Sequence, residues 1–289
     1  MRAVVFKEKG GEEVLELREI PVGNPGKGEV LVELTSVGLN RADLLFPQGL
    51  YFTKPAFAPV SSSLKKNQIS RAISRLGFEG AGRIAAIGED SRYQIGERVA
   101  FINFDNVSEQ GCLAEFAIVA EKNILPTPAT VSDEQAGAIW IQYLTAWGGL
   151  IAEGELKHDQ SVVITAASNS VGLACIQIAK LNGAHVIATT TSDDKIKALY
   201  DAGADLVLNL EKADYVEEVN RFTQGIGTDL VFDAVAGPGI RHLIQGSKKR
   251  GKIIIQGMLD RRPMEVHPGV LMKRQLTVKG FVIGHILDT

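Results

Sequence analysis

The stretch SVVITAASNSVGLACIQIAKLNGAHVIATTTSDDK, residues 161–195, decides the fold of this chain. It begins with the apolar run VVITA, turns through AASNSVG at residues 166–172, continues as a helix-like segment and ends in a second apolar run, HVIAT. A strand, a tight turn and a helix in this order present backbone N–H groups at the start of the helix, where an anion is favoured. The stretch therefore predicts a dinucleotide-binding βαβ unit, although its turn lacks two of the usual glycines.

The same alternation continues to residue 257. The strand-like runs are VVITA (162–166), HVIAT (185–189), DLVLN (205–209), DLVFDAV (229–235) and KIIIQG (252–257), and the helix-like segments are 171–181, 194–201, 213–223 and 240–249. Strands that helices cover on both faces are continuous apolar runs, as these are. The pattern predicts an α/β fold in which right-handed crossovers build a doubly wound parallel sheet of the Rossmann type.

The first part of the chain has a different pattern. Strand-like segments such as EVLVELTSVGL and ERVAFIN alternate with glycine and proline turns, which indicates a small antiparallel, barrel-like domain. Pro126 and Pro128 mark the change of pattern, and Ser132 with Gln135 has the spacing of a capping box at a helix start. We expect a first domain at residues 1–126, a nucleotide-binding domain at 127–265 and a final strand region at 266–289.

The composition excludes several classes of protein. The chain has 289 residues, 45% of them hydrophobic and 22% charged, and a net charge of −3, which gives no electrostatic reason to expect binding to nucleic acid or to an anionic membrane. No apolar run reaches the roughly 18 residues that span a bilayer. Cys112 and Cys175 have no partner spacing, so we expect two reduced thiols, which suits a cytoplasmic location.

Seven segments in order resemble the zinc-less, quinone oxidoreductase-like branch of the medium-chain dehydrogenase/reductase superfamily. They are GEVLVELTSVGLNRADLLFPQGLY (28–51), RLGFEGAGRIAAIGED (75–90), IQYLTAWGGL (141–150), VVITAASNSVGLACIQIAK (162–180), GADLVLN, FDAVAG and LTVKGFVI. The resemblance implies a GroES-like catalytic domain followed by a Rossmann domain that binds NADP(H). It also implies a homodimer, for which the segment 275–283 is the candidate pairing strand.

The sequence departs from the family pattern at two places. Residues 58–74, APVSSSLKKNQISRAIS, form a polar and basic stretch that family members lack, so we expect an insertion that acts as a lid or is disordered. Family members also continue past a segment like GFVIGH to complete the first domain. The return is absent after HILDT, and we therefore expect a truncated C-terminal return of the catalytic domain.

No zinc is expected. The positions that match the catalytic zinc ligands of the zinc-dependent relatives hold Asn40 and Phe78, and an amide and a phenyl ring cannot replace a thiolate and an imidazole around Zn²⁺. The closely spaced cysteines that hold structural zinc in those relatives are also missing. The chemistry that remains is hydride transfer from a nicotinamide to a conjugated acceptor, which needs no metal.

Three residues are candidates for catalysis. Asn40 and Tyr51 have a spacing that resembles the zinc-less reductases, where the Asn lines the site and, in enoyl-thioester reductases, the Tyr donates a proton. A phenol is suited to this, because it donates a hydrogen bond while it stays protonated at neutral pH. Thr145 matches a threonine whose hydroxyl approaches the nicotinamide. The alternatives are that Asn40 satisfies a turn and that Tyr51 and Thr145 only pack.

The coenzyme site is predicted around the turn and the end of the second strand. In the turn, Gly172 allows close contact between helix and strand, Ala167 and Asn169 take the places of the other two glycines, and the polar side chains supply donors. Threonines replace the acid expected after the second strand, and Lys195 follows, which favours a 2′-phosphate and therefore NADPH. Asp193 or Asp194 could instead bind the ribose 2′-OH. The expected cofactor-binding residues are Ala167, Ser168, Asn169, Ser170, Val171, Gly172, Thr190, Thr191, Ser192, Lys195 and Gly257.

The sequence thus favours an NADPH-dependent, metal-independent reductase of quinones or α,β-unsaturated carbonyl compounds. One alternative is an enoyl-thioester reductase, for which Lys54, Lys65, Lys66 and Arg71 are basic groups that suit a carrier phosphate. Another is a protein that binds NADPH without turnover. The expected partners are a small-molecule acceptor and a second copy of the chain.

Overall fold

The structure is a computed structural model that describes residues 1–56 and 73–287. It divides into two compact units, Met1–Ile141 and Gln142–Thr289. The division follows Ile141, whereas the sequence places the domain boundary at residue 126. The predicted insertion at 58–74 lies outside the described residues except for Ile73 and Ser74, and Ser74 is the first residue of a strand.

The first unit is built from antiparallel strands. A three-stranded sheet has the order β2-β1-β4, and a five-stranded sheet has the order β7-β3-β5-β6-β8. The strands are β1 (Arg2–Phe6), β2 (Glu16–Glu19), β3 (Glu29–Val37), β4 (Ser74–Arg75), β5 (Glu79–Ile87), β6 (Arg98–Ile102), β7 (Phe116–Ala120) and β8 (Ile124–Leu125). The helices α1 (Arg41–Leu45), α2 (Val107–Gln110) and α3 (Asp133–Ala136) are short. The predicted antiparallel architecture is confirmed.

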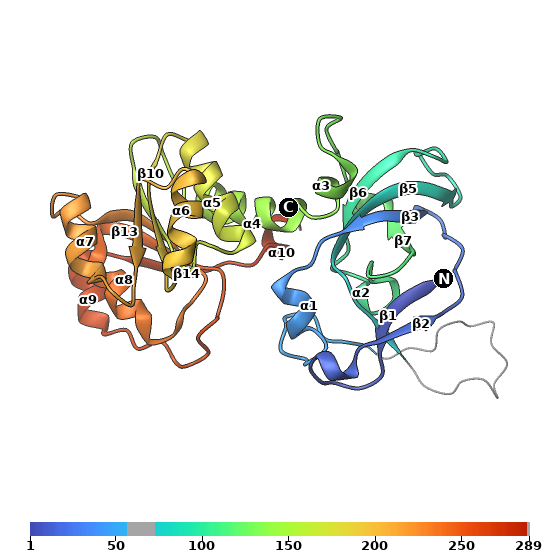
Figure 1. Ribbon diagram of the computed structural model, residues 1–289, viewed down its shortest axis with the longest axis horizontal. Helices are drawn as coiled ribbons and strands as arrows, with labels where there is room; N and C mark the ends of the chain where they lie inside the picture. Colours follow the sequence, from blue (N-terminus) through green and yellow to red (C-terminus); the bar gives the residue numbers. More distant parts are fainter. Residues whose placement is uncertain (57–72, 288–289) are drawn as a thin grey trace. The chain divides into compact units, whose positions relative to one another are not determined.

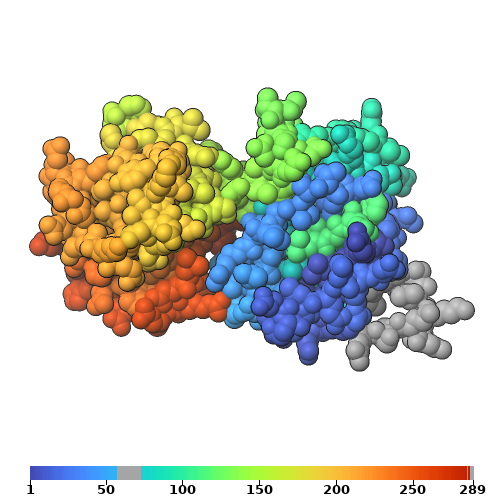
Figure 2. Space-filling model, viewed as in Figure 1, coloured from blue at the N-terminus to red at the C-terminus, as the bar shows by residue number. Residues whose placement is uncertain are grey.

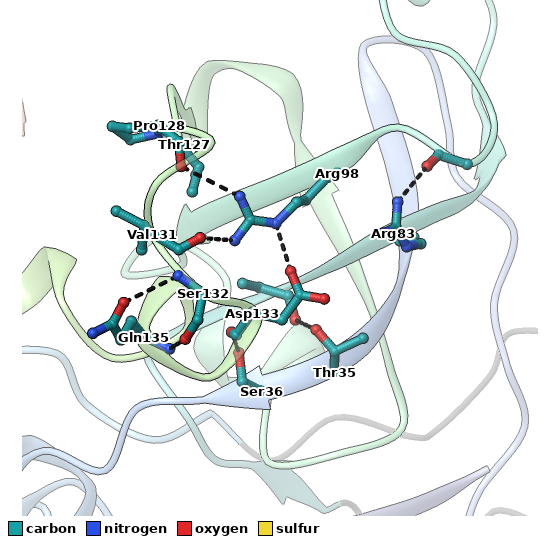
Figure 3. Close-up of polar contacts among 12 residues, drawn as sticks. Thr35, Ser36, Arg83, Arg98, Thr127, Pro128, Val131, Ser132, Asp133 and Gln135 are labelled. Atoms are coloured by element: carbon teal, nitrogen blue, oxygen red, sulfur yellow. Dashed lines mark hydrogen bonds and ion pairs between the residues drawn. The ribbon is translucent and has the colours of Figure 1, made fainter.

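The segment that follows β8 is tied to the larger sheet (Figure 3). Arg98 on β6 donates to the Asp133 carboxylate at 2.6 Å and to the Val131 carbonyl at 2.6 Å. The predicted capping box is confirmed, because Ser132 Oγ accepts from the Gln135 N–H while Gln135 Oε1 accepts from the Ser132 N–H. The exposed turn at residues 128–130 projects from the surface of this unit, green in Figure 2.

The second unit contains the predicted doubly wound parallel sheet. Its order is β11-β10-β9-β12-β13-β14, so in chain order the strands run 3-2-1-4-5-6, and the order reverses between β9 and β12. The strands are β9 (Ser161–Ile164), β10 (His185–Thr190), β11 (Leu206–Asn209), β12 (Thr228–Asp233), β13 (Ser247–Ile255) and β14 (Thr277–Gly280). The helix α4 (Trp140–Trp147) begins two residues before this unit and continues into the π-helical segment η4 (Gly148–Glu153). The other helices are α5 (Ser170–Leu181), α6 (Ile196–Asp201), α7 (Tyr215–Phe222), α8 (Ile240–Gly246), α9 (Pro268–Arg274) and α10 (Gly284–Leu287).

Successive residues of a strand point to opposite faces of the sheet, and in β9 the residues on both faces are apolar, so both faces need helices to cover them. Val162 and Ile164 of β9 belong to a core with residues of α5 and α6, while Val163 between them belongs to a core with residues of α7 and α8. Figure 1 shows these two pairs of helices on opposite sides of the sheet. Continuous apolar runs therefore bury side chains in two separate cores.

One predicted helix is too long. The segment 240–249 was expected to be helical throughout, but α8 ends at Gly246 and β13 begins at Ser247. Ser247 pairs with Thr228 of β12, and the strand continues through a register shift to pair Ile253 with Val231. Backbone pairing with β12 outweighs the polar, helix-compatible composition of SKKRG.

Two further findings concern the whole described part of the chain. Cys112 and Cys175 are both free and buried there, as expected, and burial raises the pKa of each thiol. Among residues 1–56 and 73–287, no helix is long and apolar enough to cross a membrane.

Candidate functional site

The site in the first unit is centred on Asn40, which immediately precedes α1. Its backbone N–H donates to Asp43 Oδ2 at 2.7 Å, and its side-chain Nδ2 donates to Glu79 Oε1 at 2.9 Å. The second oxygen of Glu79 accepts the backbone N–H of Ile141 at 2.9 Å. Glu79, the first residue of β5, is only 1% exposed. Both of its oxygens therefore serve as acceptors inside the unit.

Two buried carboxyl groups lie beside Asn40. Burial, together with the charge of Glu79, raises the pKa of Asp43 to about 7, and the hydrogen bond from the Asn40 backbone N–H partly opposes this rise. Burial also raises the pKa of Glu79, which the hydrogen bonds from Ile141 and Asn40 partly oppose. The sequence interpretation did not include either carboxyl group. The signal available was the position of Glu79 directly after Phe78, in the segment GFEG.

Tyr51 packs against Phe78. The two ring centroids are 5.3 Å apart, and Phe78 also contacts the rings of Phe46 and Phe104 at 5.5 and 5.2 Å. Burial raises the pKa of Tyr51 to about 12, and the charge of Asp43 contributes to the rise. The phenol is therefore protonated at neutral pH and available as a hydrogen-bond donor.

These surroundings do not fit a catalytic zinc ion. Phe78 is fully buried in the aromatic cluster, and Asn40 presents the hydrogen-bearing nitrogen of its amide to Glu79. Within the described ranges, no group of three His, Cys, Asp or Glu side chains is arranged to hold a metal ion. The donors that zinc prefers, thiolate and imidazole, are replaced here by groups that cannot coordinate it.

The turn between β9 and α5 is the main feature of the second unit. Asn169 caps the twelve-residue helix, because its Oδ1 accepts the N–H of Gly172 at 2.8 Å while its Nδ2 donates to the Ala166 carbonyl at 2.8 Å. A Cβ atom on Gly172 would lie 2.4 Å from the Ala167 carbonyl oxygen, so glycine is required there. Ser168, Asn169 and Ser170 are exposed around the first turn of α5, and Val171 follows them.

In the turn, the two residues expected to replace the missing glycines, Ala167 and Asn169, are not the ones that adopt the unusual backbone conformation. The unusual backbone conformation falls on Ala166, with φ of 46°, while Asn169 has an ordinary φ of −84°. Ala167 is fully buried, and its N–H donates to the Thr189 carbonyl at 2.9 Å. Asn169 therefore acts as a helix cap, and Ala167 lines the turn from the core side.

A second set of polar groups lies where β9 and β12 end, at the point where strand order reverses. Asp233 accepts the Thr165 hydroxyl at 2.7 Å and the N–H groups of Val235 and Ala236 at 3.0 Å each. Ala236 has a φ of 61°, which is strained for a residue with a side chain. Sequence reasoning missed Asp233, although ligands bind at the carboxyl ends of strands in such sheets.

Gly257 and Thr145 occupy different environments in this unit. Gly257 follows β13, and a Cβ atom there would lie 2.5 Å from the Ala234 carbonyl oxygen, so its backbone passes close to the end of β12. Thr145 is 3% exposed within α4. Gly257 therefore lies at the carboxyl edge of the sheet, whereas Thr145 is a buried helix residue.

The residues after β10 form the third part of the predicted coenzyme site. Thr190 is buried, and its hydroxyl accepts the N–H of Ser192 at 3.2 Å, while Thr191 and Lys195 are exposed. Asp193 is bound by two residues that the sequence interpretation did not include. Asn209 Nδ2 donates to its Oδ1 at 2.6 Å, and Lys212 forms an ion pair with its Oδ2.

Comparisons with known proteins show which families and relatives the chain is similar to. Residues 26–129 match the alcohol dehydrogenase GroES-like domain, and residues 170–289 match the family described as zinc-binding dehydrogenase. Quinone oxidoreductase of Homo sapiens is 28% identical over 285 residues, which cover 98% of this chain and 80% of the relative.

Two solved structures are similar over nearly the whole chain. The Escherichia coli quinone oxidoreductase complexed with NADPH is 27% identical, with a TM-score of 0.82 over 99% of this chain and 82% of that one. The CurK enoyl reductase is 26% identical, with a TM-score of 0.81 over 99% of this chain and 82% of that one. The GroES-like and Rossmann domains, the order of the motifs and these relatives agree, and the chain belongs to the quinone oxidoreductase-like branch of the medium-chain dehydrogenase/reductase superfamily.

Proposed function

We propose that the protein is an NADPH-dependent, metal-independent reductase that transfers hydride to quinones or α,β-unsaturated carbonyl compounds. The observation that carries the proposal is the turn between β9 and α5. It combines a capped helix N-terminus, a glycine that no other residue can replace and a position beside the reversal of strand order. Each of these features suits the pyrophosphate of a dinucleotide.

The coenzyme fits the residues present in the second unit. Ser168, Ser170 and the first N–H groups of α5 are proposed to bind the pyrophosphate, and Thr191 and Lys195 the 2′-phosphate. Gly257 leaves room at the carboxyl edge of the sheet. The NADPH complex of the E. coli relative supports this assignment.

The first unit is proposed to supply the groups that act on the acceptor. Bound NADPH supplies the hydride, and the acceptor oxygen then needs a hydrogen-bond donor and finally a proton. Tyr51 suits this role, because burial keeps its phenol protonated at neutral pH. Asn40, with its Nδ2 committed to Glu79, is proposed to line the same site. No metal is required, since conjugation in the acceptor spreads the developing charge.

A rapid-mixing experiment tests this assignment. NADPH oxidation is followed by absorbance with 1,2-naphthoquinone, an alkenal and a crotonyl thioester, one at a time. We expect faster turnover with the quinone and the alkenal than with the thioester. Fastest turnover with the thioester would instead identify an enoyl-thioester reductase, the second candidate, which the likeness to the CurK enoyl reductase favours. NADPH binding without oxidation by any acceptor would identify a binding protein.

We also propose that two copies of the chain associate through β14. The sheet order ends at this strand, whose residues are mostly exposed. An edge strand can pair with the same edge of a second copy across a two-fold axis. Light scattering coupled to size-exclusion chromatography should give the mass of a dimer, and a proline at Val278 should shift it to that of a monomer.

A further inference from the structure

Asp193 lies where its charge can affect the choice between NADPH and NADH in the proposed coenzyme site. It is the first acidic residue behind the threonines that replace the ribose-binding carboxylate of NADH-selective dehydrogenases, and it could bind the ribose 2′-OH in place of that carboxylate. A free carboxylate at this place repels a 2′-phosphate. The proposed preference for NADPH therefore requires an explanation for Asp193. The inference below rests on the proposed function, because it concerns the coenzyme of that same site.

The structure shows that both oxygens of Asp193 are engaged. Oδ1 accepts a hydrogen bond from Asn209 at 2.6 Å, and Oδ2 forms an ion pair with the Lys212 ammonium. The hydrogen bonds from Lys212 and Asn209 hold the pKa of Asp193 below its usual range, so the carboxylate is charged at neutral pH. Its negative charge is compensated by a cation within contact distance.

The backbone fixes the positions of both partners. Asn209 is the last residue of β11, pairs in register with Thr190 of β10 and is 7% exposed. Its carbonyl accepts the N–H of Lys212 at 3.0 Å, and its side-chain oxygen accepts the N–H of Glu211 at 3.0 Å. A tight turn after β11 thus brings Lys212 back to the loop that follows β10. The pair joins two adjacent loops at the carboxyl edge of the sheet.

We infer that Lys212 determines the coenzyme preference indirectly, by pairing with Asp193 so that this carboxylate neither repels a 2′-phosphate nor orients freely toward a ribose 2′-OH. Lys212 is a specificity-determining residue that acts through Asp193, whereas Lys195 is proposed to contact the phosphate itself. Replacing Lys212 should therefore change NADPH affinity only when Asp193 is present, whereas replacing Lys195 should change it with or without Asp193. That difference separates an indirect from a direct electrostatic role.

A double-mutant cycle tests the inference by direct titration with NADPH and NADH, which needs no acceptor and no turnover. Lys212→Ala removes the cation beside Asp193 and leaves only the neutral Asn209 as its partner, and we expect NADPH affinity to fall about tenfold while NADH affinity is retained or increased. In the Asp193→Asn background, the same lysine substitution should change NADPH affinity by less than about threefold. Lys195→Ala should weaken NADPH binding in both backgrounds.

The control is Lys197→Ala, which removes the exposed ion pair with Asp201 on α6 and should leave both affinities unchanged. Thermal unfolding followed by circular dichroism establishes that each variant is folded. An equal loss of NADPH affinity on removing Lys212 in both backgrounds would show direct contact with the phosphate and overturn the inference. The inference would also be overturned if the ratio of NADPH affinity to NADH affinity were the same in Lys212→Ala as in the unmutated protein. If the unmutated protein binds neither coenzyme, the proposed function itself fails, which is a distinct result.

Discussion

Asn40 donates its side-chain Nδ2 hydrogen to Oε1 of Glu79 at 2.9 Å, across 39 positions of sequence. A carboxylate can only accept hydrogen bonds, so this contact requires that the nitrogen of the Asn40 amide, and not its oxygen, faces Glu79. The resemblance of the sequence to the zinc-less reductases made Asn40 a candidate site residue. The residue that sets its orientation became evident only from the fold.

Replacing Glu79 with Gln should weaken this arrangement. Glu79 accepts from Asn40 with one oxygen and from the Ile141 N–H with the other, and Gln offers only one oxygen. Either the Asn40 side-chain N–H or the Ile141 backbone N–H then faces the buried amide nitrogen of Gln and loses its hydrogen bond. This loss should lower the free energy of unfolding by about 1–3 kcal/mol. Urea unfolding measures the change. The exposed Glu89→Gln is the matched control, and an equal effect of both substitutions would contradict the role given to Glu79.

The stability of the protein should fall as the pH rises from about 4 to about 7. The pKa of Asp43 lies at about 7 in the folded chain, against 3.8 for an ordinary Asp side chain. Between these values the folded state binds a proton that the unfolded state has released, so the free energy of unfolding decreases with rising pH. The stabilisation is complete below about pH 4 and is lost above about pH 7, with a maximal size of roughly 4 kcal/mol.

Asp43→Asn should reduce this dependence. The amide is always neutral and keeps an oxygen for the Asn40 N–H, so the variant should lose less stability than the unmutated protein between pH 5 and pH 8. Urea unfolding at the two pH values provides the comparison. Asp201→Asn, at an exposed site in the second unit, should behave like the unmutated protein. Identical pH dependence in the Asp43 variant and the unmutated protein would show that Asp43 does not titrate in this range.

Tyr51→Phe should impair reduction of the acceptor without weakening coenzyme binding. Phe keeps the ring contact with Phe78 and loses only the hydroxyl. Loss of one hydrogen bond to a developing oxyanion costs roughly 2–4 kcal/mol, which should appear in kcat/KM for an alkenal. Quinones accept electrons more readily and should be affected less. Tyr93→Phe serves as the control, and an unaltered kcat/KM for the alkenal would mean that Tyr51 only packs.

Purified protein should contain well under one zinc per chain. The expectation rests on Phe78 in its aromatic cluster and on the amide of Asn40, at the two places that match zinc ligands in relatives. Elemental analysis measures the metal content, and treatment with a chelator should leave NADPH oxidation unchanged. Stoichiometric zinc would require a site built from other residues.

Lys195→Ala should reduce NADPH affinity roughly ten- to a hundredfold, because a hydrogen bond to a charged group contributes about 1.5–3 kcal/mol. NADH affinity should hardly change, since NADH carries no 2′-phosphate. Equilibrium titration by coenzyme fluorescence measures both. Tighter binding of NADH than of NADPH to the unmutated protein would contradict the interpretation of the residues after β10.

The fold of the second unit could be predicted because its signal is local and repeated. Each apolar run buries side chains on both faces, so strands such as β9 and β10 are recognisable without knowledge of their neighbours. The end of α8 at Gly246 could not be predicted in this way. It depends on the pairing of Ser247 with Thr228, a contact between different parts of the chain.

The candidate site was predicted less completely than the fold, for the same reason. The resemblance to the zinc-less reductases made Asn40 and Tyr51 candidates, and turn chemistry made Gly172 and the polar residues before it candidates. The partners that determine orientation and charge, Glu79 for Asn40 and Lys212 for Asp193, are distant in sequence. The backbone strain at Ala166 was also missed, because nothing in the composition of the turn shows which residue takes the positive φ.

The central position of β9 has a consequence for amide hydrogen exchange. All four of its residues are buried, and it is paired on both sides, with β10 and β12. Its amides can exchange with deuterium only when the second unit opens as a whole, so their exchange rates report its global stability. The turn that we propose binds the pyrophosphate is attached directly to this strand. Coenzyme should therefore find that turn already ordered, and the extra protection from deuterium on binding should appear mainly in the exposed residues between β10 and α6.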